Sequence, residues 1–128
     1  QRAGNHPGHI GMIAHKAAYT HARDWLDAAV AGIDENRHAL AELLRIHLPG
    51  ARYTPPEGTY LAWIDCRELG LGDDPAKVFL EQGRVALNSG LAFGDGGDGF
   101  VRFNLATSPA IIAEAVERMA SVPAIATV

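Results

Sequence analysis

The sequence predicts an α/β fold of the α+β kind, with long N-terminal helices and a small mixed or antiparallel sheet flanked by two helices. Two observations carry this prediction. Apolar residues recur at helical spacing up to position 48, and short runs rich in β-branched and aromatic residues follow Pro49. The expected order is α-α-β-β-α-β-β-α. We expect residues 1–48 to form a helical interdomain segment and residues 49–128 a small C-terminal domain.

Two helices are expected before Pro49. In residues 10–21 the small and apolar residues follow the i, i+3, i+4, i+7 spacing of one helix face. Asp24 can cap a second helix, which Pro49 ends. A helix of about 24 residues is about 36 Å long, more than the rest of so small a chain can cover. We therefore expect its apolar stripe to be partly uncovered, at Leu26, Val30, Ile33, Leu40 and Leu44.

Short strands alternate with helices after Pro49. Residues 59–65 are β-branched, aromatic and apolar on both faces, which indicates a buried strand. Asp74 and Pro75 begin a short helix, and Ser108 and Pro109 begin the last one. The remaining expected segments are an extended stretch at 53–54, strands at 85–88 and 100–105, a glycine-rich loop at 91–99 and a loose tail at 122–128.

Composition limits the function classes. Hydrophobic residues make up 48% of the 128 residues and charged residues 20%, which is typical of a globular domain. The net charge of −4 favours neither a nucleic-acid partner nor an anionic membrane surface. No apolar run approaches the roughly 18 residues of a membrane helix. Cys66 is the only cysteine, which excludes an intramolecular disulfide and fits a cytoplasmic protein.

Neither the histidines nor the glycine-rich loop predicts a metal or nucleotide site. None of the six histidines has the i, i+4 pairing of a helical zinc site, so we expect no bound metal. Residues 94–99 match G-x-G-x-x-G, but they precede a strand and carry two aspartates where phosphate charge would lie. We interpret them as a flexible connection. Cys66, at a strand end, is interpreted as a packing residue.

Arg102 is the residue that most needs an explanation. Strand alternation places it with Phe100 and Asn104 on one face, and a guanidinium among apolar neighbours needs acceptors. One interpretation is a structural ion pair with an Asp or Glu of the chain. The alternative is a carboxylate that arrives with a substrate, because the fork of Arg binds carboxylate through two hydrogen bonds.

Four segments taken together resemble a known superfamily. PPEGTYLAWIDCRELGL, FLEQGRVALNSGLAFGDGGDGFVRFNLATS and AEAVERMA are similar to the C-terminal part of fold-type I pyridoxal-phosphate (PLP) enzymes of the class I/II aminotransferase superfamily. TYLAWIDCR points to the MalY/PatB-like cystathionine β-lyase branch. The upstream stretch AAYTHARDWLDAAVAGIDENRHALAELL resembles the long interdomain helix of that family.

The resemblance implies that Arg102 grips the α-carboxylate of an amino-acid substrate, with Asn88 and Gly90 as further candidates beside it. It also implies that the catalytic lysine and the cofactor-binding residues lie outside this chain, because neither Lys16 nor Lys77 lies in the family's lysine motif. The chain begins without Met and is interpreted as a fragment, inactive by itself and without bound PLP.

We therefore expect the full-length parent to be a cytoplasmic, homodimeric PLP-dependent carbon–sulfur β-lyase or class I/II aminotransferase. Its substrate would be an amino acid such as cystathionine or cysteine. These sequence features fit a lyase and an aminotransferase equally, because either reaction needs the substrate carboxylate to be held. The alternative is a free-standing, non-catalytic α/β module that binds a carboxylate ligand.

Overall fold

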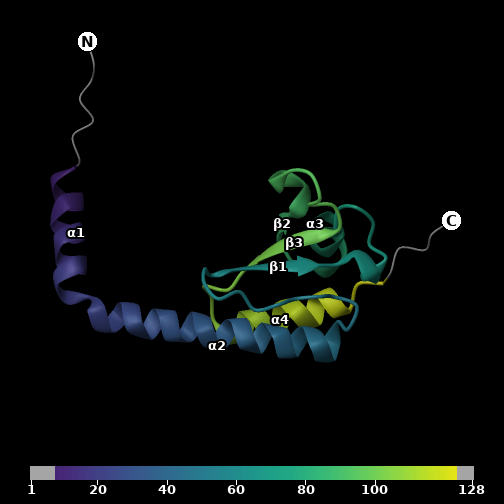
Figure 1. Cartoon of the computed structure of the whole chain (residues 1–128), viewed down its shortest axis with the longest axis horizontal. Helices are drawn as coiled ribbons and strands as arrows, with labels where there is room; N and C mark the ends of the chain where they lie inside the picture. The colour runs from purple at the N-terminus through teal and green to yellow at the C-terminus, as the bar shows by residue number, and fades with distance from the viewer. Residues whose placement is uncertain (1–7, 124–128) are drawn as a thin grey trace, which may run out of the picture. The chain divides into compact units, whose positions relative to one another are not determined.

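The computed structural model describes residues 8–123, which form two compact units that meet between Gly32 and Ile33. Helix α1 (His9–His21) and the beginning of α2 (Arg23–His47) lie in the first unit. The second unit holds the rest of α2 and all later elements (Figure 1). Helix α2 begins one residue before the predicted cap, so Asp24 lies in its first turn instead of capping it.

The second unit is built on a three-stranded antiparallel sheet in the order β1-β3-β2. Its strands are β1 (Leu61–Asp65), β2 (Asn88–Ser89) and β3 (Phe100–Asn104). Helix α3 (Pro75–Val78), which continues as a wider helical turn over Phe79–Gly83, connects β1 to β2, and α4 (Pro109–Ala120) follows β3. The prediction of an α+β domain with a small antiparallel sheet is confirmed.

Two predicted strand segments differ from the structure. Residues 53–54 form no strand, and the preceding residue, Arg52, makes an isolated bridge with Asp65. Prolines follow at once, and because proline lacks an N–H the ladder cannot continue. Strand β2 is also shorter than predicted, since the N–H of Val85 donates to the carbonyl of Phe79 in the preceding turn instead of pairing with β3.

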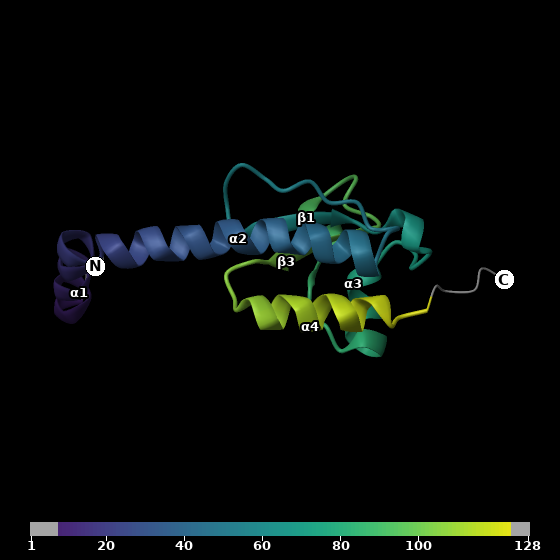
Figure 2. The same cartoon turned by 90° about the horizontal axis from the view of Figure 1, so that it is seen from below.

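The hydrophobic core lies on one face of the sheet. Figure 2 shows α4 running beside α2, and in the second unit both helices supply side chains to this core. Leu40 and Leu44 are therefore fully buried, and the prediction that they would be uncovered is wrong, whereas Leu26 (47% exposed) and Val30 (58%) agree with it. The core members are Leu40, Leu44, Leu48, Ala62, Ile64, Cys66, Leu71, Ala76, Phe79, Val85, Val101, Phe103, Leu105, Ile112, Val116 and Met119.

The other face of the sheet is open in residues 8–123. In β1 only alternate residues, Ala62 and Ile64, are buried, whereas Trp63 between them is 40% exposed. The prediction that this strand is buried on both faces is therefore wrong. The physical reason is that the helices of the second unit pack on one side, so apolar residues on the other side have no cover.

Polar side chains make hydrogen bonds to the backbone at the edge of the core. Asn36 in α2 is 4% exposed, and its amide nitrogen donates to the carbonyls of Leu105 (2.9 Å) and Thr107 (2.8 Å). Ser108 caps α4 as predicted, because its hydroxyl accepts the N–H of Ile111. Asp74 precedes α3 without making a capping bond.

Among residues 8–123, no helix combines the length and the apolar content needed to cross a bilayer. The last five residues of the predicted tail, 124–128, lie outside the described part of the chain, as does His6.

Candidate functional site

Arg102 lies at the centre of the open face of the sheet. It stands in the middle of β3, opposite Trp63 of β1 and Asn88 of β2 in the pairing register. Because its neighbours Val101 and Phe103 are buried, alternation points the side chain of Arg102 away from the core. The prediction that Arg102 occupies a separate face from the core residues is confirmed.

Two groups hold the guanidinium of Arg102. Its Nη2 donates to the Oδ1 of Asn88 at 3.0 Å, and its Cζ lies 4.8 Å from the centroid of the Phe93 ring. No carboxylate among residues 8–123 forms an ion pair with Arg102, so the described chain does not support a structural ion pair. Its Nε is buried without an acceptor there. The group retains unused capacity to bind an anion.

The structure brings Asn88 to Arg102 but gives Gly90 a different environment. Gly90 is buried, and a Cβ built on it would lie 2.0 Å from the carbonyl oxygen of Gly97 and 2.8 Å from that of Phe100. Backbone, not an open surface, surrounds this glycine. Gly90 begins the short helical turn Gly90–Phe93. Its close contact with the backbone of Gly97 fixes the position of this turn, and therefore of Phe93.

Three aromatic rings border Arg102 on the open face, and two of them were not singled out from the sequence. Trp63 meets Phe93 edge to face at 5.5 Å between centroids and stacks on Phe100 at 5.5 Å. Trp63 and Phe93 are separated by 30 positions in sequence, so only the strand pairing brings them together. The exposed position of Trp63 in an alternating strand is the one signal that could have indicated it.

An ion pair lies against Phe100, the ring in this group that contacts Arg67. The guanidinium of Arg67 donates to both carboxylate oxygens of Asp65, at 2.9 and 2.7 Å, and its Cζ lies 4.9 Å from the ring centroid of Phe100. These hydrogen bonds from Arg67 lower the pKa of the Asp65 carboxyl and keep it ionised. Arg67 is therefore already neutralised by Asp65, whereas Arg102 on the same face has no carboxylate partner among residues 8–123.

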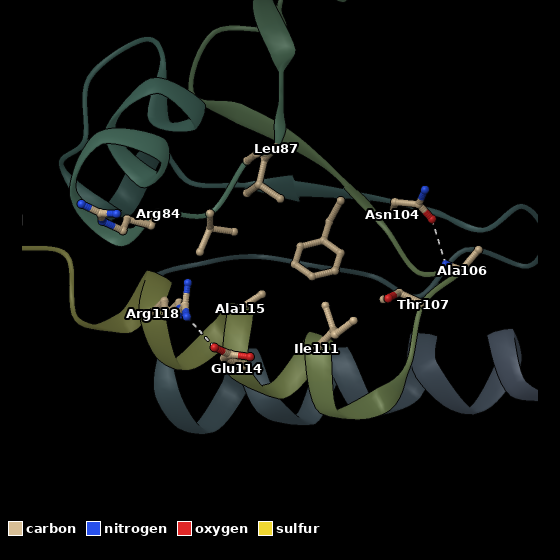
Figure 3. A pocket seen from close by; sticks show the side chains of 12 residues that line it. Arg84, Leu87, Asn104, Ala106, Thr107, Ile111, Glu114, Ala115 and Arg118 are labelled. Carbon is tan, nitrogen blue, oxygen red and sulfur yellow. Dashed lines mark hydrogen bonds and ion pairs between the residues drawn. The ribbon is translucent and has the colours of Figure 1, made fainter.

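A cavity of about 560 Å³ lies elsewhere, between α4 and the segment that precedes β2 (Figure 3). Its lining includes Phe103, whose side chain projects to the opposite face of β3 from that of Arg102, and it does not include Arg102. Arg118 and Glu114 at its wall form an ion pair at 2.5 Å, and Arg84 is exposed. The cavity thus presents no buried charged group to a ligand.

The remaining candidate groups are a buried cysteine and two exposed lysines. Cys66 is 1% exposed, and burial raises the pKa of its thiol to about 12, so it stays a protonated packing residue at neutral pH. Lys16 and Lys77 are exposed on α1 and α3, and neither lies beside Arg102 in a strand or turn. Their surroundings do not fit a lysine that holds PLP covalently. No three His, Cys, Asp or Glu residues within 8–123 gather as metal ligands.

Comparisons with known proteins identify relatives of this chain. No family model matches the chain. The chain is 48% identical, across 93% of its length, to a Mycobacterium tuberculosis protein whose name assigns it provisionally to the cystathionine β-lyases, and it covers 33% of that protein. It is 33% identical to cystathionine β-lyase PatB of Bacillus subtilis, covering 86% of this chain and 29% of PatB.

Solved structures agree. A Corynebacterium diphtheriae protein provisionally named as a PLP-dependent β-cystathionase superposes with a TM-score of 0.86 at 39% identity, covering 96% of this chain and 33% of that one. Cystalysin from Treponema denticola, which contains PLP, superposes with a TM-score of 0.83 at 31% identity, covering 89% of this chain and 29% of cystalysin.

Fold and sequence therefore define the class: the chain matches the small C-terminal domain of fold-type I PLP-dependent enzymes. Within that class it is a homologue of the cystathionine β-lyases of the MalY and PatB kind. The chain spans about a third of the length of the curated relatives that it matches, 33% for the first and 29% for PatB.

Proposed function

We propose that this chain is the substrate-carboxylate-binding part of a longer PLP-dependent enzyme that acts on amino acids as a carbon–sulfur β-lyase. The observation that carries the proposal is Arg102: a guanidinium on the open face of β3, oriented by Asn88 and Phe93 and without a carboxylate partner in residues 8–123. The lyase names of the relatives support this choice of reaction. Class I/II aminotransferase chemistry is the second candidate, since an aminotransferase is also among the relatives.

PLP, held by the rest of the enzyme, supplies the electron sink that makes the Cα–H bond of an amino acid acidic. This chain contributes orientation. Arg102 binds the α-carboxylate through its two terminal nitrogens and Asn88 keeps one of them in place, so the Cα of the substrate is held at a fixed position. The aromatic rings beside Arg102 exclude water from one side of that ion pair, which strengthens it.

The full-length enzyme is expected to convert cystathionine and water into homocysteine, pyruvate and ammonia without an added 2-oxo acid. Pyruvate is measured by coupled reduction with lactate dehydrogenase, and ammonia is measured separately in the same reaction. A 1:1 yield of the two products supports the lyase proposal. Transfer of the amino group to an added 2-oxo acid, with no free ammonia, would contradict it and favour the aminotransferase.

The isolated 128-residue chain is expected not to hold PLP at one defined lysine, because Lys16 and Lys77 are both exposed on helices. The chain is incubated with PLP, reduced with borohydride and digested, and the pyridoxyl-lysines are quantified by mass spectrometry. We expect sparse labelling at both lysines, equal to that of a urea-unfolded control. Stoichiometric labelling at a single lysine of the folded chain would show that the cofactor site lies within it.

We also propose that the full-length enzyme is a cytoplasmic homodimer in which the first helices of this chain, α1 and the start of α2, are covered by the rest of the assembly. Ile10, Tyr19 and Trp25 are exposed large apolar side chains in the first unit. Exposed apolar surface of several hundred Å² normally marks a contact with another domain or subunit. The single, buried Cys66 is compatible with a reducing compartment.

A further inference from the structure

The surroundings of the Arg102 guanidinium leave only its two terminal nitrogens, within residues 8–123, accessible to a carboxylate. Nη2 is bonded to Asn88, Nε is buried without an acceptor, and Nη1 makes no hydrogen bond within residues 8–123. A carboxylate can therefore reach Nη1 and the second N–H of Nη2, at the end of the fork, but cannot reach Nε. This end-on arrangement works only if the plane of the guanidinium is fixed.

Phe93 is the group that fixes this plane. Asn88 restrains a single nitrogen, about which the guanidinium can still rotate, whereas the Phe93 ring lies against the carbon centre at 4.8 Å. A guanidinium prefers to lie over the face of an aromatic ring, so the ring selects one orientation among the many open to a half-buried arginine.

Other aromatic rings in turn support the ring of Phe93. Trp63 meets it at an interplanar angle of 88°, and Trp63 lies nearly parallel, at 15°, to Phe100. Phe100 contacts Arg67, which is fixed by Asp65. The row Phe100–Trp63–Phe93 thus connects an anchored ion pair to the guanidinium of Arg102, and the Gly90–Gly97 backbone contact holds the turn that carries Phe93.

Neither Phe93 nor Trp63 has the burial of a core residue. Phe93 is 50% exposed and Trp63 is 40% exposed, and neither is part of the hydrophobic core. Packing of the hydrophobic core therefore does not explain why a phenylalanine is at position 93.

We infer that Phe93 is a positioning residue, which orients Arg102 for the substrate carboxylate and so contributes to the preference for amino acids over amines. This inference rests on the proposed role of Arg102. Phe93 does not touch the reacting atoms; it acts through the guanidinium, with Trp63 supporting its ring.

The test uses the full-length enzyme with Phe93→Leu, Phe93→Tyr and the control Leu91→Ala. Leu91 is on the same helical turn and is equally exposed at 50%, but it makes no contact with the guanidinium comparable to that of Phe93. We expect Phe93→Leu to raise KM for the amino acid about tenfold with kcat nearly unchanged. Phe93→Tyr should restore wild-type KM, and Leu91→Ala should leave it unaltered.

The decarboxylated amine separates positioning from a general effect on the active site. Phe93→Leu should lower the preference for amino acid over amine about tenfold while leaving the amine reaction unchanged. Added to Arg102→Ala, it should have no further effect, because the two residues act as a unit. Full retention of the preference in Phe93→Leu, or an additive double variant, would overturn the inference. Full retention of the preference in Arg102→Ala would instead overturn the proposed function.

Discussion

In the full-length enzyme, Arg102→Lys is expected to lower kcat/KM for an amino-acid substrate by about ten- to a hundredfold, and Arg102→Ala by more. Lysine keeps the charge but loses the fork, so one of two charge-assisted hydrogen bonds to the carboxylate disappears. Such a bond contributes about 1.5–3 kcal/mol, which corresponds to that range of rate. Steady-state kinetics with cystathionine measures the effect.

The substrate comparison makes this result specific. The wild-type enzyme should strongly prefer the amino acid to its decarboxylated amine, and Arg102→Ala should lose most of this preference. Cofactor content, followed by visible absorbance, should stay constant, because the two lysines of the chain, Lys16 and Lys77, lie exposed on helices away from Arg102. If the preference survives in a folded Arg102→Ala protein, the carboxylate is bound elsewhere and the site assignment is wrong.

A thermal melt distinguishes a structural role. Arg102 makes no ion pair in residues 8–123, and its hydrogen bond to Asn88 is on the open face. Removing an exposed interaction of this kind costs about 0–1 kcal/mol. A large fall in melting temperature, with full activity in the protein that remains folded, would favour a structural function for Arg102.

Gly90→Ala is expected to destabilise the isolated chain by about 3 kcal/mol or more. The added Cβ would lie 2.0 Å from a backbone oxygen of Gly97, which cannot rotate away as a side chain could. Overpacking normally costs about 1–3 kcal/mol, and a clash with backbone lies at the upper end. With a slope of about 1.5 kcal/mol per M, the urea midpoint measured by circular dichroism should fall by about 2 M.

Gly58→Ala is the matched control for this substitution. Gly58 has no heavy atom within 4 Å of a built Cβ and no positive φ, so its midpoint should change little. Equal midpoints for the two variants would mean that the turn at Gly90–Phe93 moves aside freely. In that case the backbone contact between Gly90 and Gly97 does not fix the position of Phe93.

Helix positions could be read from the sequence because their signals are local. Ser108 and Pro109 specify the start of α4 within a single turn, and helical spacing specifies α1. The burial of β1 could not be read in the same way. The face of β1 that carries Trp63 is buried only if another element packs on it. The sequence of the strand alone does not show whether such an element is present.

The same limit applies to the candidate site. Alternation in β3 placed Arg102 on the correct face, and a resemblance suggested Asn88 beside it. The contacts of Phe93 depend on the pairing of β1 with β3 and on the Gly90–Gly97 contact, which join positions far apart in the chain. Local patterns do not encode such pairings, so the aromatic support of Arg102 required the structure.

The buried Asn36 has a mechanical consequence for this site. Its amide binds the carbonyls of Leu105 and Thr107, and Leu105 follows the strand of Arg102 directly. Leu40 and Leu44, one and two turns further along α2, pack in the same core as Val101 of that strand. We therefore expect a tilt of α2 from Ile33 onward to move β3, and Arg102 with it. Over this part of α2, the helix and the strand that carries Arg102, the proposed carboxylate-binding residue, are expected to move together.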